Sequence, residues 1–138
     1  MALSASDTDK YPQAQAVVDA SGNPLLVRAP VSVYRVLSAA ASTNAAEIKA
    51  SAARLHKLHV NGAAGHAIYI KLYNRIGTPD ETHTPVFTIA VTDGAITHDF
   101  GGHVFDTGLG IRAVVGSADN DTAALTSGDF LGLNIQYT

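Results

Sequence analysis

The chain has 138 residues, of which 46% are hydrophobic and only 15% charged, with a formal net charge of −3 and no cysteine. This length and apolar content fit one domain with a real core, and the absence of cysteine excludes disulfides and thiolate sites. An acidic balance without a basic run argues against a nucleic-acid partner. No apolar run reaches the roughly 20 residues of a membrane helix, so we expect no membrane partner.

The first 30 residues differ in composition from the rest of the chain. Their opening stretch is rich in Ser, Asp, Ala and Gln and is too polar to pack by itself. It also lacks the basic start and apolar stretch of a secretory signal, so we expect synthesis in a cytoplasm. Apolar patches at Ala16–Ala20 and Leu25–Val27 flank a turn at Ser21–Pro24. We expect residues 1–30 to form an extended N-terminal arm that orders against a partner, with an edge strand at Leu25–Arg28 as the alternative.

After the arm, short β-prone runs follow one another. Val31–Leu37 and Arg54–Asn61 predict strands, and in the second of them Leu55 is out of phase, which indicates a β-bulge near His56. The alanine-rich segment between them lacks an apolar stripe at helical spacing. We therefore expect a short strand at Glu47–Ala50, with a helical turn as the alternative.

The stretch 67–91 organises the rest of the chain. Its first run alternates strictly, which puts an apolar face on a core and a polar face in water. We expect Ile68, Ile70 and Leu72 to point inward and Tyr69, Lys71 and Tyr73 to point outward. A polar connection with glycine and proline follows, and Val86–Val91 predicts a second strand.

The turn at Thr92–Gly94 carries the strongest hairpin signal, because its Asp-Gly pair joins two β-prone runs. A strand at Ala95–Phe100 follows, and we expect the Gly101–Gly102 pair to end it. The remaining elements are a strand at Ile111–Val115, a polar loop at Gly116–Asp129 and a last strand at Phe130–Tyr137. In the last strand we expect one face to carry Leu131, Leu133, Ile135 and Tyr137.

About eight short strands, separated by turn signals and without a clear helix, predict an all-β domain at residues 31–138. The expected architecture is an antiparallel β-sandwich, jelly-roll-like in strand number, with the extended N-terminal arm attached. Its expected core contains Ile68, Ile70, Leu72, Phe87, Ile89, Ile111, Leu133 and Ile135.

Metal sites find little support in the residue spacing. Neither the H-x-H pair with a later Glu and His that a cupin uses nor an H-E-x-x-H motif is present. The loop Asp119–Thr122 offers oxygen ligands at alternate positions, but it lacks the glycine and distal glutamate of a calcium loop, and such loops turn without metal. We expect no metal and treat the histidines as surface or interface residues: His56, His59, His66, His83, His98 and His103.

Catalytic residues are equally hard to assemble. Asp99 with His98 and His103 forms an acid–base set that could be placed near Ser117, but no nucleophile elbow or other activating context accompanies it. We therefore expect neither enzyme activity nor a cofactor. The outward tyrosines of the 67–91 stretch suit sugar stacking or cross-strand pairing.

Several phrases of the sequence resemble a recurrent small structural protein of tailed bacteriophages. The family pattern has a strand ending in K-L-Y-[DN], a T-P-V stretch, a T-G-[LI] turn and an A-D-N-D-T loop. The matching positions are Lys71–Asn74, Thr84–Val86, Thr107–Leu109 and Ala118–Thr122. The resemblance covers about two-thirds of the chain, from Thr43 onward, and the chain departs from the pattern at His98 and Asp99.

The resemblance implies a β-sandwich virion protein without enzyme activity, made in the host cytoplasm. It implies a head-decoration (cement) protein on the capsid surface, with the major capsid protein as partner, and we expect a homotrimer. The arm would then lie across a neighbour through its apolar residues Val17, Val18, Leu25, Leu26 and Val27. The alternative is a tail or fibre component that binds a receptor or glycan, although the heptads of a coiled stalk are missing. A host-derived carbohydrate-binding module also stays open, although the chain has no tryptophan and only five tyrosines.

Overall fold

The computed structural model describes residues 20–22 and 30–138, and the described residues form eight β-strands and no helix. Most strand bounds lie within one or two residues of those expected, and the last strand matches at both ends. The alanine-rich segment adopts the short strand rather than the helical turn. The strands are β1 (Ser32–Ser38), β2 (Ala46–Lys49), β3 (Ala53–Gly62), β4 (Ile68–Tyr73), β5 (Phe87–Val91), β6 (Gly94–Phe105), β7 (Leu109–Val114) and β8 (Phe130–Tyr137).

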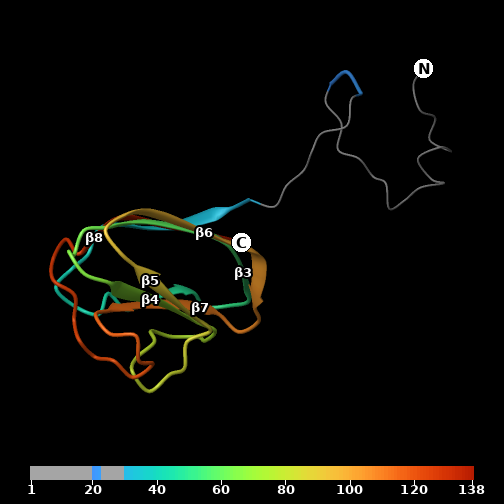
Figure 1. Ribbon diagram of the computed structural model, residues 1–138. Helices are drawn as coiled ribbons and strands as arrows, with labels where there is room; N and C mark the ends of the chain where they lie inside the picture. The colour runs from blue at the N-terminus through green and yellow to red at the C-terminus, as the bar shows by residue number, and fades with distance from the viewer. Residues whose placement is uncertain (1–19, 23–29) are drawn as a thin grey trace. The chain divides into compact units, whose positions relative to one another are not determined.

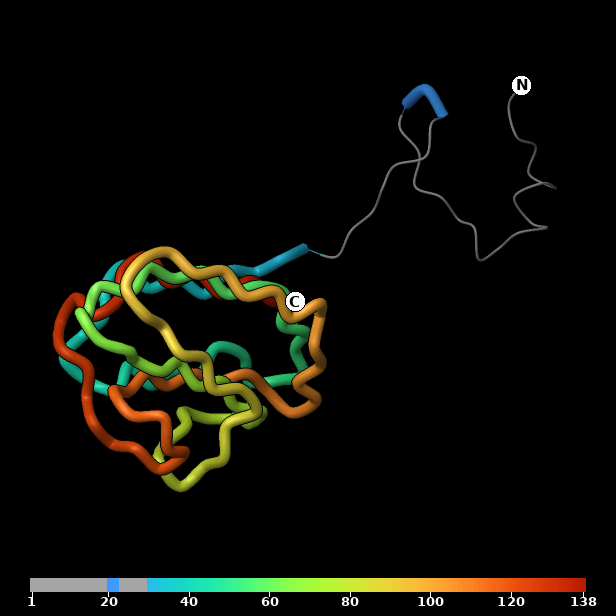
Figure 2. Tube along the Cα trace, in the orientation of Figure 1, coloured from blue at the N-terminus to red at the C-terminus, as the bar shows by residue number. Residues whose placement is uncertain are grey.

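The strands form two four-stranded antiparallel sheets, with orders β1-β8-β3-β6 and β2-β7-β4-β5. Figure 1 shows the two sheets as separate layers. The chain behaves as one long hairpin folded at the β4–β5 connection, because β4 pairs with β5, β3 with β6, β2 with β7 and β1 with β8. All the remaining connections cross from one sheet to the other, as the tube in Figure 2 traces. This arrangement is a jelly roll and confirms the expected all-β antiparallel β-sandwich.

The core lies between the sheets and is built from inward side chains of both layers. Seven of the eight expected core residues are at most 6% exposed, and Phe87 packs against them half-buried. Leu55, Leu58 and Val60 of β3 are fully buried as well. Each buried aliphatic side chain of this size contributes about 1.5–3 kcal/mol, so this layer supplies the driving force for folding.

The predicted bulge near His56 is confirmed, and it changes the interpretation of the glycine pair. The β3–β6 register shifts between Leu55 and Lys57, where β6 inserts extra residues. Gly101 and Gly102 lie in that insertion with φ values of 62° and 80°, a region that side chains with a Cβ rarely adopt. The expectation that the pair ends the strand is therefore wrong, because β6 continues through the bulge.

Two further expectations fail for reasons of local geometry. The turn at Thr92–Gly94 does not make a hairpin, because β5 pairs with β4 while β6 pairs with β3 in the other sheet. In β8, the backbone of Gly132 has a φ of 58°, which breaks the alternation. Phe130 is therefore buried and Leu131 is exposed, so Leu131 does not share the inward face of Leu133.

The arm residues Val17, Val18, Leu25, Leu26 and Val27 lie outside the described residues, so their role stays a prediction. The same holds for the division of the chain at residue 30. Among the residues that the structure describes, no helix is long and apolar enough to cross a membrane.

Candidate interaction surface

The two sheets differ in how their outer faces are covered. Lys71 and Tyr73 of β4, expected to face water, are 0% and 1% exposed, and Arg112 of β7 is 1% exposed. The loop 74–86 places Pro79 directly over Gly110 of β7, and the loop 116–129 covers the two cations. Figure 1 shows both loops on the side of β4 and β7 that faces away from the other sheet. The expectation that Lys71 and Tyr73 lie on a solvent-exposed face is wrong, because loops of the chain itself cover the outer face of β4 and β7.

Two buried cations attach the loop 116–129 to the sheet. Lys71 and Arg112 are direct register partners on β4 and β7. The Lys71 ammonium donates to the carbonyl of Ala118, and Arg112 donates to the carbonyl of Asp121 at 2.7 Å and to the hydroxyl of Tyr73 at 3.2 Å. Desolvation by burial and the neighbouring Arg112 lower the pKa of Lys71, although the nearby aspartates oppose this. The pair therefore holds a structural loop at an electrostatic cost.

The loop Asp119–Thr122, which has oxygen atoms at alternate positions, uses the carboxylate of Asp121 for its own turn. The carboxylate of Asp121 accepts hydrogen bonds from the backbone N–H groups of Gly116 at 2.9 Å and Ala123 at 3.3 Å. This is the turn chemistry that Asx residues supply without metal. Within residues 20–22 and 30–138, no three His, Cys, Asp or Glu side chains gather as metal ligands would.

The histidines lie at separate places, each with a local partner. His56 shares a hydrogen bond of 3.1 Å with Thr138, and His59 shares one of 2.8 Å with Thr97. The ring nitrogen of His66 lies 3.0 Å from the carbonyl of the next residue. Such single partners fit surface positions on a β-sheet better than a shared ligand site.

The expected acid–base set does not come together around a nucleophile. His98 and His103 pack instead against phenylalanine rings near β5, with the His103 and Phe87 ring centres 4.9 Å apart. The carboxylate of Asp99 accepts the backbone N–H of Gly101 at 2.9 Å, within the β6 bulge. Ser117 belongs to the loop that covers the opposite sheet. Packing and turn formation therefore account for these side chains.

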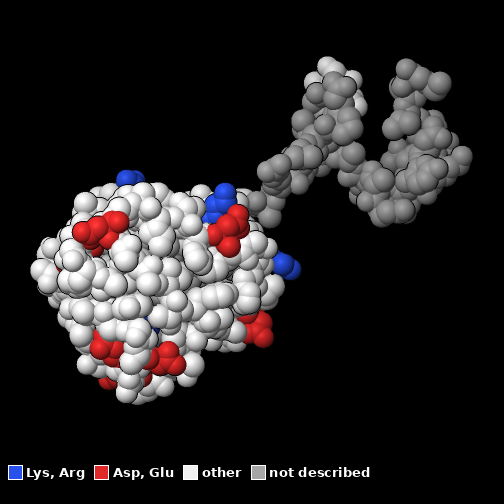
Figure 3. All heavy atoms as spheres, in the orientation of Figure 1, with Lys and Arg blue, Asp and Glu red and all other residues white. Residues whose placement is uncertain are grey.

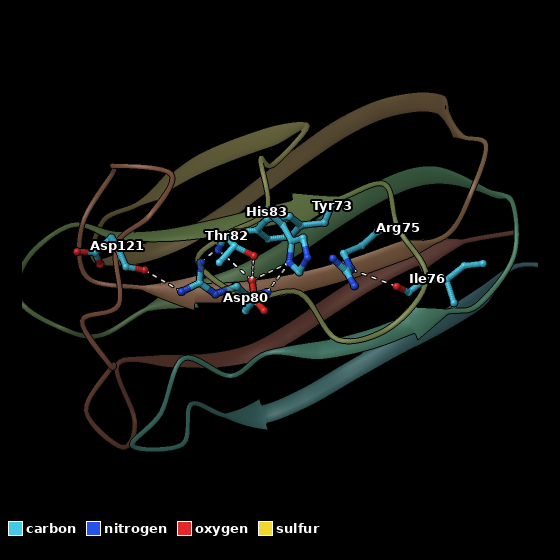
Figure 4. A network of polar contacts seen from close by, with 8 residues as sticks. Tyr73, Arg75, Ile76, Asp80, Thr82, His83 and Asp121 are labelled. Carbon is cyan, nitrogen blue, oxygen red and sulfur yellow. Dashed lines mark hydrogen bonds and ion pairs between the residues drawn. The ribbon is translucent and has the colours of Figure 1, made fainter.

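A shallow hollow of about 280 Å³ lies beside the loop 74–86 and is lined by Tyr73, Asn74, Arg75, Thr82, His83 and Thr84. Figure 4 shows Thr82 and His83 directed at Asp80. The Asp80 carboxylate accepts two hydrogen bonds from Thr82, which lower its pKa, and lies 2.9 Å from the His83 ring. Tyr73 is buried, so the expected sugar-stacking pair of Tyr69 and Tyr73 is not formed. The polar groups around this hollow mainly stabilise the loop itself.

The other sheet carries an outer face with exposed apolar side chains. On β1, Val33 and Leu37 are 52% and 69% exposed, and Val31 precedes them, also exposed. Leu131 of β8 and Val104 of β6 add exposed apolar groups to the same sheet. On the face drawn in Figure 3, uncharged side chains predominate and charged groups are few. We call β1 with its exposed Val31, Val33 and Leu37 the β1 edge.

The sequence contained a signal for the β1 edge that the strand assignment alone did not use. Val33 and Leu37 alternate with Tyr34 and Val36, so both faces of this strand carry apolar residues. In an edge strand only one of these faces can lie on the core, which leaves the other for a partner. Lys71 and Arg112 offered no comparable signal, because each looks like an ordinary outward polar residue.

Comparisons with known proteins add little to this picture. No protein-family model matches the chain, and no curated protein matches it. Among solved structures, the coat protein of Tobacco streak virus is similar over 82% of this chain and 89% of its own, with 13% identity and a TM-score of 0.35. At such a TM-score the assignment of the fold rests on the strand order of this chain and not on the viral coat protein.

Proposed function

We propose that this protein is a non-enzymatic structural protein of a tailed-bacteriophage virion that decorates the outside of the capsid. It binds between major capsid subunits as a homotrimer. The resemblance of its sequence phrases to a phage structural family supplies the context. The observation that carries the proposal is the difference between the two sheets: one covers its outer face with its own loops, and the other presents exposed apolar groups.

The way in which the polar groups are used also supports a binding role. Asp80, Asp99 and Asp121 each accept hydrogen bonds from neighbouring residues of their own loop or strand. Groups engaged in this way stabilise turns, whereas a catalytic site needs a nucleophile and a base within reach of each other. Jelly rolls occur in viral capsid proteins, lectins and cupins. Cupins bind a metal ion, and the described residues contain no cluster of metal-ligating side chains, which favours the first two classes.

In this proposal residues 1–30 form an arm that lies across a neighbouring subunit in the shell. Its two apolar patches are short and cannot build a core alone, so contacts with a partner would offset the entropy lost on ordering. The contacts are assigned to Val17, Val18, Leu25, Leu26 and Val27.

The test is localisation in purified particles, by imaging and by copy number relative to the major capsid protein. We expect copies spread over the head in numbers comparable to the capsid subunits. A few copies at the tail would refute decoration and support the alternative, a tail or fibre component that binds a receptor or glycan. That alternative draws on the lectin use of the same fold.

Deleting Met1–Ala29 tests the arm separately, because the eight described strands begin only at Ser32. We expect the shortened protein to keep its β-sheet circular-dichroism spectrum and to lose binding to particles that lack the protein. Undiminished binding would refute the role of the arm and leave the sandwich faces as the interface.

A further inference from the structure

The described strands leave four edges, and three of them carry features that hinder pairing with another chain. β2 has four residues with a register shift between Glu47 and Lys49, and β5 has five residues, so both edges are shorter than β1. β6 is interrupted by the bulge at Gly101 and Gly102. β1 differs from all three, because it pairs with β8 without a register shift over seven residues and leaves its other side open among the described residues.

The side chains of β1 suit a further strand on both faces. Val33 and Leu37 are exposed on the outer face, while Tyr34 and Val36 are only half-buried on the inner one. A strand that lay beside β1 would cover both sets. Its sequence would have to be apolar at consecutive positions, as in strands that are buried on both faces.

A second copy of β1 fits this requirement poorly. When two antiparallel β1 strands place Val33 opposite Leu37, Arg35 of one copy lies opposite Arg35 of the other. Like charges that face each other across strands are destabilising. Moving the register by two residues separates the arginines and pairs Val31 with Leu37, but it places each Arg35 opposite Val33, without a charged partner.

The chain contains a better match in Leu25–Arg28, which begins with three consecutive apolar residues and lies shortly before β1. A tight hairpin back onto the same β1 would need a residue with positive φ in the connection. The connection Ala29-Pro30-Val31 is poorly suited to supply one, because it contains no glycine and proline fixes φ at about −65°. The segment is therefore better placed to pair with the β1 edge of another copy.

We propose that the β1 edge of each copy accepts Leu25–Arg28 of a second copy as an additional strand. This inference rests on the proposed function and deepens it, because the exchange supplies the contact that joins the copies of the homotrimer. Added strands of this kind bind through main-chain hydrogen bonds, and alternate side chains provide the specificity. Donor segment and acceptor edge are different surfaces, so the contact is heterologous, and a rotation of one third of a turn per copy closes it into a ring of three.

Cross-linking of single-cysteine variants tests the exchange, since the natural chain has no cysteine. Leu26→Cys in a tagged full-length chain is co-expressed with Leu37→Cys in an untagged one, and a short bismaleimide is added. We expect a cross-linked product containing one chain of each kind. The matched control is Val104→Cys, because this side chain is 51% exposed on the bulged edge β6. It should give at least tenfold less mixed product.

Three results would overturn the inference. They are a wild-type mass of one chain, 14.3 kDa, an equal yield of mixed product with Val104→Cys, and, in a chain that carries both Leu26→Cys and Leu37→Cys, cross-links within single chains only. A double substitution Val33→Lys and Leu37→Lys provides a second measurement. We expect it to reduce the mass to that of one chain while the β-sheet circular-dichroism spectrum is kept, since both positions are exposed.

These outcomes separate the two proposals. Mixed cross-links in a protein that does not bind particles would refute the decoration role and leave the exchange standing. Particle binding by a protein that yields no mixed cross-links would refute the exchange alone.

Discussion

Truncation of Ile70 tests whether the two sheets enclose a tightly packed core. Ile70 is fully buried in β4, with Ile89 and Ala113 as its register partners on the two neighbouring strands. Ile70→Ala removes three carbon groups, and their transfer to water costs about 2.4 kcal/mol at about 0.8 kcal/mol each. Because hydrogen-bonded strands on both sides prevent the gap from closing, we add a cavity contribution of about 1–2 kcal/mol. The expected loss is about 4 kcal/mol.

Urea unfolding, followed by circular dichroism, measures this loss, and an unchanged m value would show that the unfolded surface stays the same. Val104→Ala is the control, because Val104 is exposed and surface truncations usually change the free energy of unfolding by less than about 0.5 kcal/mol. A loss below about 1 kcal/mol for Ile70→Ala would refute the packing described here.

Three further predictions concern backbone approach, charge and metal. Gly62→Ala should destabilise the protein by more than Ile70→Ala or prevent folding, because its Cβ would lie 1.9 Å from the backbone oxygen of Thr92; a melting temperature within a few degrees of wild type would contradict this. The folded-state pKa of Lys71 is lowered from 10.5, so the unfolded chain binds more protons as the pH approaches that value. As the pH is raised, the free energy of unfolding of the wild type should therefore increase relative to that of Lys71→Met, by at most about 1.4 kcal/mol per pH unit. If urea titrations give the same difference between the two proteins at every pH, Lys71 keeps its ordinary pKa. Addition of a chelator should leave the melting temperature unchanged, and a fall of about ten degrees would reveal a structural ion.

Local patterns in the sequence predicted most strand positions, because alternation and turn residues act over a few positions. The bulge near His56 could be predicted because Leu55 alone is out of phase with the alternation of its strand. The Asp93-Gly94 turn failed for the opposite reason. Its residues fix how the chain reverses, but the pairing of β5 and β6 depends on β4 and β3, which lie far away in the sequence.

The covered sheet face could not be predicted from alternation at all. Alternation shows that Lys71 and Tyr73 point away from the core, but not what lies above them. The cover comes from a loop that follows more than 40 residues later and reaches Lys71 through the carbonyl of Ala118. For the candidate surface, the sequence offered apolar residues on both faces of β1, and only the strand order showed that β1 is an edge.

The pairing of β1 with β8 has a consequence for the order of folding during synthesis. Ser32 pairs with Tyr137, so β1, the first described strand to be made, receives its partner only after β8, the last described strand, has been synthesised. Contacts of such long sequence separation slow folding. The hairpin β4–β5 can form early, and the sheets then close outward from it. Until β8 is available, β1 has no pairing partner on either side within the described sheet. We therefore expect premature association of nascent chains to occur mainly through β1.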